Sequence, residues 1–283
     1  MKIGVMVESF RVGLDEGLKA AAGIKADGVQ IYATGDALKP DTLNAKGRSE
    51  LRRRIADLGL EISALCGDFG GHGFQIAAEN AEKIDATRKV IDLALDLGCR
   101  IVTTHIGVVP AAADHPRYAV LAKACAAIGR YANEMNAVLA IETGPEPAAI
   151  LRGFLDDIGM DAGLGVNFDP ANLVMVCREN IPEAVRILGK YIVHTHAKDG
   201  LNLKPVDPEQ LCGAFAGDAT VGFDWRAYIR EVPLGKGQVP FAVYLATLRE
   251  TGYDGFLTVE REAGENPRAD ISEAVQYLRS LIK

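Results

Sequence analysis

Short runs of β-branched and other apolar residues alternate along the chain with longer stretches whose apolar residues recur every three or four positions. The first pattern is typical of buried strands and the second of amphipathic helices. Several helical stretches end in glycine, as in IADLG, LALDLG, FLDDIG and LRETG, where a left-handed C-cap would return the chain to the next strand. The pattern predicts eight strands, at residues 2–7, 28–33, 61–68, 100–107, 138–144, 164–169, 191–199 and 255–262.

Eight alternating units of about 35 residues each predict an α/β protein built as a single (β/α)8 barrel, the TIM barrel, with residues 1–283 as one domain. A doubly wound sheet seldom has eight strands in strict alternation. The connection 200–238, after the seventh strand, is much longer than the others. We therefore expect a long insertion there that forms a substrate lid or a pocket wall, with an oligomer contact as the alternative.

The composition narrows the class of partner. A net charge of −7 argues against wholesale binding to nucleic acid or to an anionic membrane, because both require a basic surface. The sequence shows neither a signal-peptide pattern nor an apolar run of membrane-spanning length. Five cysteines without C-x-x-C spacing are typical of buried free thiols in a reducing compartment. We expect a cytoplasmic protein with a small-molecule partner. The sequence leaves open whether the protein forms a homo-oligomer.

Four consecutive predicted strands each place a group able to bind a metal near the C-terminal end. Side chains alternate between the faces of a strand, so residues two apart share one face. If these faces look into the barrel, three carboxylates and one imidazole converge, from Glu142, Asp169, His196 and Glu260. Buried like charges cost several kcal/mol per ion unless a cation offsets them. Oxygen-rich ligation with one imidazole suits Mn²⁺, Mg²⁺ or Co²⁺ better than a closed structural zinc site.

Two further histidines face the same interior. His194 shares the inward face of His196 but lies one layer deeper, so we expect it to support the site by hydrogen bonding. His105, near the end of the fourth strand, either binds substrate hydroxyls or fills the barrel mouth.

Three further residues are weaker candidates for substrate contact. Lys198 and Asp199 lie in the last turn of the predicted seventh strand, where they would reach substrate, orient the ligands or form a loop salt bridge. The glycine-rich stretch GDFGGHGF (67–74) lacks the spacing of a phosphate-binding loop. We expect it to be a flexible active-site loop that carries His72.

The segments IETGPE, NFDPANL, HTHAKD and FLTVERE contain the four ligand candidates in order. In these segments the chain resembles the xylose isomerase-like barrels, in the sugar (phosphate) isomerase and epimerase branch that includes D-tagatose 3-epimerase-like enzymes. The resemblance implies that the four residues bind one divalent metal. Mn²⁺ is the first candidate for this metal, and Mg²⁺, Co²⁺ and Zn²⁺ are alternatives. It also implies that Glu142 and Glu260 act as an acid/base pair. The implied activity is isomerisation or epimerisation of a small carbohydrate or polyol-derived substrate through a metal-bound enediolate.

One position departs from this family. Many epimerases of the branch have histidine three residues after the aspartate of the sixth strand, where it contacts substrate oxygens, but here Asn172 occupies that position. Asparagine can hydrogen-bond a hydroxyl but cannot take up a proton. The sequence therefore does not establish that the substrate is the ketose usual in this branch. Arg261 and Arg268 are candidates for binding a phosphate or are surface charges.

Three alternative functions remain from the sequence. An endonuclease IV-like enzyme, which cuts DNA at abasic positions, would require a histidine-rich three-metal site, and the acidic chain with five histidines argues against it. In a metal-dependent amidohydrolase the H-x-H motif belongs on the first strand, which here reads GVMVE. A barrel that binds a sugar or metabolite without catalysis is compatible with the sequence.

Overall fold

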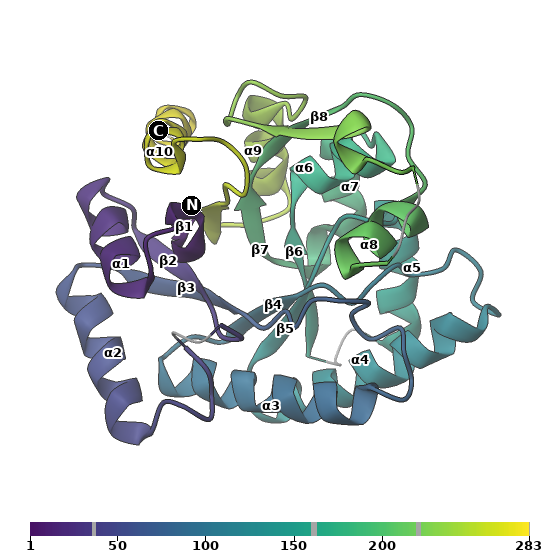
Figure 1. Ribbon diagram of the computed structural model, residues 1–283, viewed down its shortest axis with the longest axis horizontal. Coiled ribbons are helices and arrows are strands. Elements are labelled where there is room, and N and C mark those ends of the chain that lie inside the picture. The colour runs from purple at the N-terminus through teal and green to yellow at the C-terminus, as the bar shows by residue number, and fades with distance from the viewer. Residues whose placement is uncertain (36–37, 160–162, 219–221, 283) are drawn as a thin grey trace.

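The computed structural model describes residues 1–35, 38–159, 163–218 and 222–282. Eight parallel strands close into a barrel in the order β1-β10-β7-β6-β5-β4-β3-β2, surrounded by helices (Figure 1). The barrel strands are β1 (Lys2–Met6), β2 (Gly28–Tyr32), β3 (Glu61–Cys66), β4 (Ile101–Thr104), β5 (Val138–Glu142), β6 (Leu164–Phe168), β7 (Ile192–Ala197) and β10 (Phe256–Val259). The predicted (β/α)8 barrel is confirmed, and each strand lies within its predicted range.

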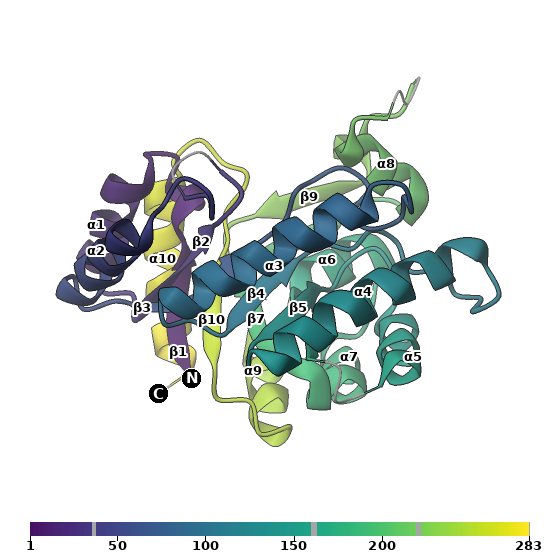
Figure 2. The same ribbon diagram turned by 90° about the horizontal axis from the view of Figure 1, so that it is seen from below.

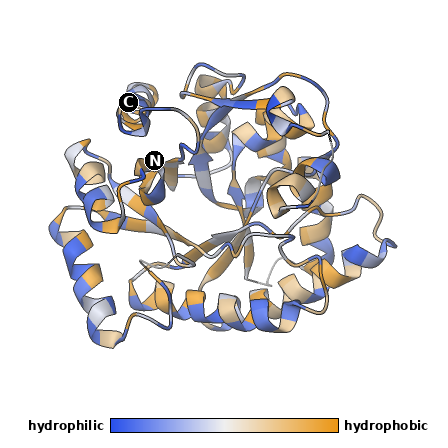
Figure 3. Ribbon diagram, viewed as in Figure 1, coloured by the Kyte–Doolittle hydropathy of each residue, from blue (hydrophilic) through white to orange (hydrophobic). Residues whose placement is uncertain are grey.

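The helices cover the outside of the barrel, apart from α8, which lies at one end of it (Figure 2). They are α1 (Leu14–Gly23), α2 (Ala45–Asp57), α3 (Asn80–Asp96), α4 (Pro116–Glu134), α5 (Ala148–Ile158), α6 (Pro170–Asn172), α7 (Ile181–Leu188), α8 (Pro208–Ala216), α9 (Phe241–Glu250) and α10 (Pro267–Leu281). The outer helices carry both hydrophilic and hydrophobic residues, whereas the central strands are mostly hydrophobic (Figure 3). Within the described ranges, no helix combines the length and apolarity needed to cross a membrane.

Glycines terminate helices where the sequence predicts them. Gly59, Gly98, Gly159 and Gly252 have φ values of 74°, 84°, 105° and 85°. Only glycine adopts this left-handed region without a steric penalty, so each residue reverses the chain toward the next strand.

The cysteine prediction is only partly confirmed. All five cysteines are free thiols, as expected, but burial is complete only for Cys66, Cys99 and Cys125. Cys177 and Cys212 are half-buried.

The long connection after β7 is a structured excursion. β8 (Asp199–Asn202) pairs antiparallel with β9 (Ile229–Val232), and α8 lies between them in the chain. Figure 2 shows α8 and β9 at one end of the barrel and both termini at the other. Residues 219–221 of the predicted insertion lie outside the described residues. The predicted seventh strand extends two residues too far at its C-terminal end, because the pairing of β7 with β10 ends at Ala197 and Asp199 already belongs to β8.

Candidate metal centre

Four ligand-capable side chains meet at the C-terminal end of the barrel. Glu142 is the last residue of β5 and His196 lies in β7, while Asp169 and Glu260 directly follow β6 and β10. These strands are neighbours in the closed sheet, so their ends lie side by side. All four side chains are buried, with exposures of 7% or less. The inward faces predicted from strand alternation are therefore the faces that meet.

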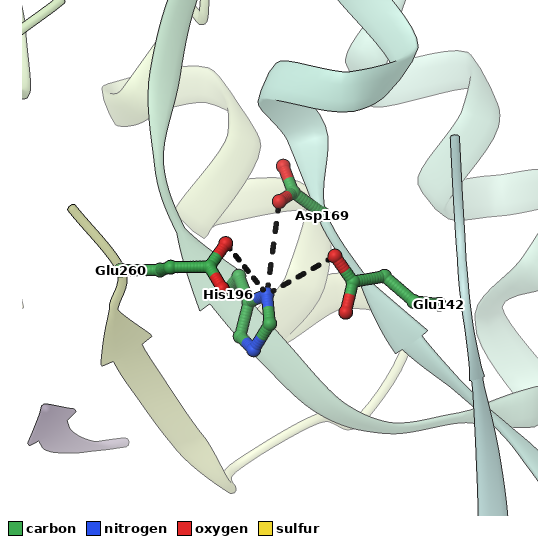
Figure 4. A group of neighbouring side chains, drawn as sticks. All are labelled: Glu142, Asp169, His196 and Glu260. Carbon is green, nitrogen blue, oxygen red and sulfur yellow. Dashed lines mark ion pairs between the residues drawn. The ribbon is translucent and has the colours of Figure 1, made fainter. Parts of the chain in front are cut away.

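The histidine stands at the centre of the three carboxylates (Figure 4). Nδ1 of His196 lies 3.5 Å from Oε1 of Glu142, 3.6 Å from Oδ2 of Asp169 and 3.4 Å from Oε2 of Glu260. One candidate ligand atom from each residue lies within 4.8 Å of the others. The carboxylates of Glu142 and Glu260 approach from opposite sides in this view.

Only one carboxylate oxygen of Asp169 is available to the centre. Its Oδ1 caps α6 by accepting hydrogen bonds from the backbone N–H groups of Ala171, at 2.7 Å, and Asn172, at 3.1 Å. Its Oδ2 is buried and has no hydrogen-bond partner. An unpaired buried carboxylate oxygen costs free energy that a bound cation would offset. Together with the oxygen-rich donor set, this oxygen shows that the residues fit a divalent metal.

Gln30 orients the imidazole of His196. The Gln30 side chain donates to Oγ1 of Thr103 at 2.8 Å, which directs its Oε1 toward Nε2 of His196 at 3.0 Å. Without a cation, Glu260 and Glu142 outweigh burial and hold the pKa of His196 well above its usual value. With a cation bound, a proton on Nε2 would leave the lone pair of Nδ1 free to bind it. The sequence prediction missed Gln30, although a polar residue at an inward position of the buried run GVQIYA was a usable signal.

His194 lies in a hydrogen-bonded layer below the centre, as predicted. Its Nδ1 lies 2.8 Å from Oδ1 of Asn167, and its Nε2 lies 3.0 Å from Oγ1 of Thr258. Burial and the neighbouring His196 hold the pKa of His194 well below its usual value, so the ring is neutral. Asn167 then donates to Oε2 of Glu142 at 3.0 Å, which links this layer to the metal centre.

The two glutamates of the centre have opposite pKa shifts. Burial raises the pKa of Glu142, but His105 and His196 outweigh burial and hold it well below the usual range. Burial raises the pKa of Glu260 to about 7, against the opposing effects of Lys198 and His196. Two carboxyl groups with separated pKa values can play different parts in proton transfer.

Lys198 supplies a buried positive charge beside the centre. Its Nζ donates to Oε2 of Glu260 at 2.8 Å and also to Oε2 of Glu262. Burial lowers the pKa of Lys198, but Glu260 and Glu262 outweigh burial and hold it well above its usual value. The side chain therefore carries a full positive charge at the wall of the cavity.

His105 and Asn172 contact the metal centre from its rim. Nδ1 of His105 lies 3.0 Å from Oδ2 of Asp68, and its Nε2 lies 3.4 Å from Oε1 of Glu142. Asn172 donates to the same Glu142 oxygen and to the carbonyl of Thr143, both at 3.2 Å. Both residues line the cavity above the centre.

Asp199 and His72 lie elsewhere than the substrate-contact prediction implied. The carboxylate of Asp199 accepts hydrogen bonds from the backbone N–H groups of Gly200, Gly235, Gly237 and Val239. It therefore anchors the excursion. Within the described part of the chain it does not form the loop salt bridge that was the alternative. Nε2 of His72 lies 3.0 Å from Oδ1 of Asp218, and glycines of its loop line the cavity while His72 does not.

Neither of the two arginines considered for phosphate binding lines the cavity. Arg261 is 7% exposed, donates to Asp270 at 2.8 Å and pairs with Glu231. Its guanidinium is thus neutralised within the protein. Arg268 lies in the first turn of α10 and is not among the cavity-lining residues.

A cavity of about 890 Å³ opens above the metal centre. Glu142, His196 and Glu260 lie in its floor, and Gly70, Gly71 and Gly73 line one side. The excursion supplies another wall, lined by Leu211, Phe215, Trp225, Arg226, Ile229, Arg230 and Glu231. The insertion is therefore a pocket wall, one of the two roles expected of it.

The chain belongs to the xylose isomerase-like TIM barrel family, whose model matches residues 18–281. No curated protein gives a significant match. A xylose isomerase domain protein from Planctomyces limnophilus has a similar structure, with 28% identity, a TM-score of 0.79, and 99% of this chain and 96% of that chain covered.

Two further solved structures share the fold at lower identity. A D-tagatose 3-epimerase-like protein has 20% identity and a TM-score of 0.74, with 100% of this chain and 98% of that chain covered. A D-psicose 3-epimerase, solved in the presence of D-fructose, has 16% identity and a TM-score of 0.73, with 100% and 99% covered. The resemblance inferred from the four sequence segments is thereby confirmed at the level of the family.

Proposed function

We propose that this protein is a divalent-metal-dependent isomerase or epimerase that acts on a small carbohydrate or polyol-derived substrate. The observation that carries the proposal is the convergence of three buried carboxylates on Nδ1 of His196, with Oδ2 of Asp169 unpartnered, in the floor of a large cavity. Membership of the xylose isomerase-like family and the epimerases among its structural neighbours support the same class of reaction.

The metal would be held by Glu142, Asp169, His196 and Glu260. Three oxygen donors and one imidazole favour Mn²⁺, with Mg²⁺, Co²⁺ or Zn²⁺ as alternatives. When bound, the ion would act as a Lewis acid that polarises the substrate carbonyl and balances the carboxylate charges.

Glu142 and Glu260 are the proposed proton carriers. Their carboxylates flank the centre from opposite sides, so one can remove the proton from the carbon next to the carbonyl and the other can return one. Return to the opposite face of the same carbon gives an epimer, and return to the adjacent carbon gives an isomer.

Three cavity residues are proposed to position the substrate. The Lys198 ammonium can donate to a developing negative oxygen beside Glu260, because its Nζ already lies on the cavity wall. His105 and Asn172 can hydrogen-bond hydroxyl groups from the opposite rim, where both approach Oε1 of Glu142. Asn172 cannot exchange a proton, so this position orients the substrate without taking part in acid–base chemistry.

Solvent exchange tests the proposal directly. Protein loaded with Mn²⁺ in D₂O should introduce deuterium at the carbon next to the carbonyl of a cognate sugar, detected by mass spectrometry and proton NMR. The panel comprises ketoses, aldoses, keto-sugars and inositol derivatives, each with and without metal. Exchange that requires the metal supports the proposal. Absence of exchange across the panel, together with a thermal shift on ligand addition, would favour a barrel that binds such a molecule without turnover.

A further inference from the structure

Tyr32 is the last residue of β2 and lines the cavity above the candidate metal centre. Residues two apart on a strand share a face, so the side chain of Tyr32 lies on the same face as that of Gln30. Gln30 points into the barrel, where it contacts His196. Tyr32 therefore also points inward, one layer nearer to the cavity mouth. The sequence prediction missed Tyr32, as it missed Gln30.

The hydroxyl of Tyr32 is unpaired. Within the described part of the chain it forms no hydrogen bond. The oxygen is not sealed into the core, because it is absent from the buried polar atoms that lack a partner. A phenol releases its proton only well above neutral pH, so this group is a hydrogen-bond donor. It is available to a ligand that enters the cavity.

Other side-chain donors at the floor and rim of the cavity are already paired. Lys198 donates to two carboxylates, and Asn172 donates to a carboxylate and to a backbone carbonyl. His105 is held by Asp68. A ligand that uses these donors competes with contacts that the protein already makes. The Tyr32 hydroxyl can bond a ligand without breaking any contact in the described part of the protein.

The position of Tyr32 complements that of Asn172. β2 and β6 face each other across the barrel, four strands apart in either direction around the closed sheet. Tyr32 ends β2, and Asn172 follows β6 in α6. The neighbouring strands β1 and β3 contribute Met6 and Cys66 to the cavity, and neither side chain is a strong donor. A substrate oxygen on this side of the cavity therefore meets the hydroxyl of Tyr32.

We infer that Tyr32 is a specificity-determining residue, whose hydroxyl donates a hydrogen bond to one hydroxyl oxygen of the substrate on the side of the cavity away from Asn172. The inference rests on the proposed function, in which the substrate carbonyl lies at the metal. Because Tyr32 stands one layer above that level, the oxygen within its reach is a hydroxyl of the same molecule. A substrate with hydrogen in place of this hydroxyl forfeits the bond.

A cycle that combines Tyr32→Phe with monodeoxy sugars tests this inference. The probe is the panel sugar with the fastest metal-dependent exchange or, if none exchanges, the sugar that binds the Mn²⁺-loaded protein most tightly. Titration calorimetry measures its affinity and that of each monodeoxy analogue. Tyr32→Phe should weaken binding of the full sugar by about fivefold. One analogue should show a similar loss with the parent protein and no further loss with the variant.

Three results would overturn the inference. The first is an unchanged affinity of Tyr32→Phe for the full sugar, and the second is a cycle in which the losses add for every analogue. The third is failure of every panel sugar to bind, which would also contradict the proposed function.

A matched variant and two further measurements separate sugar recognition from folding. Tyr118→Phe removes a hydroxyl that donates to Asp157 at 2.6 Å, away from the cavity, and should leave sugar affinity unchanged. Tyr32→Phe should bind Mn²⁺ as the parent does and should unfold at the same temperature or higher, because its hydroxyl has no partner in the described protein. Weaker metal binding or lower stability that accounts for the sugar loss would assign the hydroxyl a structural role and contradict the inference.

The outcome for the proposed function can be read independently. Deuterium exchange into the sugar, with additive losses throughout the cycle, would leave the isomerase proposal intact and overturn the role of Tyr32. A non-additive cycle for one analogue, without exchange into any sugar, would do the reverse.

Discussion

At the scale of single residues, hydrogen bonds from neighbouring groups fix the side chains of the candidate metal centre. Asp169 uses one oxygen to cap α6, and His196 uses one nitrogen to contact Gln30, so a single atom of each faces the centre. Glu142 is held by Asn167 and Asn172. These hydrogen bonds fix the ligand geometry before any metal binds, which lowers the cost of ordering it.

Glu142→Gln should separate proton transfer from metal binding. The amide retains an oxygen for the metal but cannot accept a proton, so deuterium exchange should fall by about a hundredfold or more. Calorimetry with Mn²⁺ should still detect binding. Glu134→Gln, at an exposed position of α4, serves as the control. Exchange at the unaltered rate would remove Glu142 from the mechanism.

Gln30→Leu should weaken metal affinity by roughly ten- to a hundredfold, because Nε2 of His196 loses its acceptor and the ring is no longer held in one orientation. Gln30→Glu keeps an acceptor at the same place and should bind the metal more tightly than the leucine variant. Titration calorimetry of both variants, with circular dichroism to verify folding, makes the comparison. Equal affinities in the two variants would show that Gln30 does not orient His196.

Glu146 provides a pH-dependent prediction away from the metal ligands. It is 3% exposed, accepts a hydrogen bond from the N–H of Val109 at 3.1 Å, and burial raises its pKa to about 8. The folded protein thus holds this proton more tightly than the unfolded chain. The contribution of Glu146 to stability is present below the ordinary pKa of 4.5 and falls as the pH rises to about 8.

Glu146→Gln removes this titration while keeping an oxygen that can accept from Val109. Denaturant unfolding should show that the variant gains stability relative to the parent between pH 5 and 8, by at most about 4 kcal/mol. Parallel stability curves for the two proteins across this range would contradict the assignment.

At the scale of elements, one buried carboxylate joins the two ends of the excursion between β7 and α9. Asp199 accepts four backbone N–H groups from β8 and from the segment that follows β9. Gly237 is required at this point, since a Cβ there would lie 2.1 Å from Oδ1 of Asp199. The position of the cavity wall over the candidate metal centre therefore depends on a buried carboxylate that is not itself among the cavity-lining residues.

Asp199→Ala should release this wall. Losing charge-assisted hydrogen bonds should lower local stability by roughly 2–4 kcal/mol, so hydrogen exchange at Gly235, Gly237 and Val239 should accelerate while the barrel strands stay protected. Asp224→Ala, which removes a cap from an exposed short helix of the same excursion, should have a smaller effect. Uniform destabilisation of strands and excursion would show that Asp199 supports the whole fold.

At the scale of the whole molecule, the proposed metal site links the stability of the fold to cation binding. Three carboxylates in one buried site repel one another, and a cation that binds only the folded state adds stability by mass action. Mn²⁺ at a hundred times its dissociation constant should add about 2.7 kcal/mol and raise the melting temperature by several degrees.

Asp169→Asn should remove this stabilisation while keeping the cap on α6, because the amide oxygen can still accept the Ala171 and Asn172 N–H groups. We expect the metal-free variant to be at least as stable as the metal-free parent, since one buried charge is absent. Differential scanning calorimetry with and without Mn²⁺ measures both quantities. A variant that retains the full metal-induced shift would exclude Asp169 as a ligand.

The sequence by itself determined the barrel and the four residues of the centre. Strand periodicity is local, and in a closed parallel barrel the C-terminal ends of neighbouring strands must meet, so Glu142, Asp169, His196 and Glu260 could be placed together from spacing alone. Only the tertiary structure decided which groups surround them. Gln30 reaches His196 from 166 positions away, and Asp199 turned out to anchor backbone amides that follow it by up to 40 positions. Such contacts depend on loop paths and side-chain directions, which strand and helix periods do not specify.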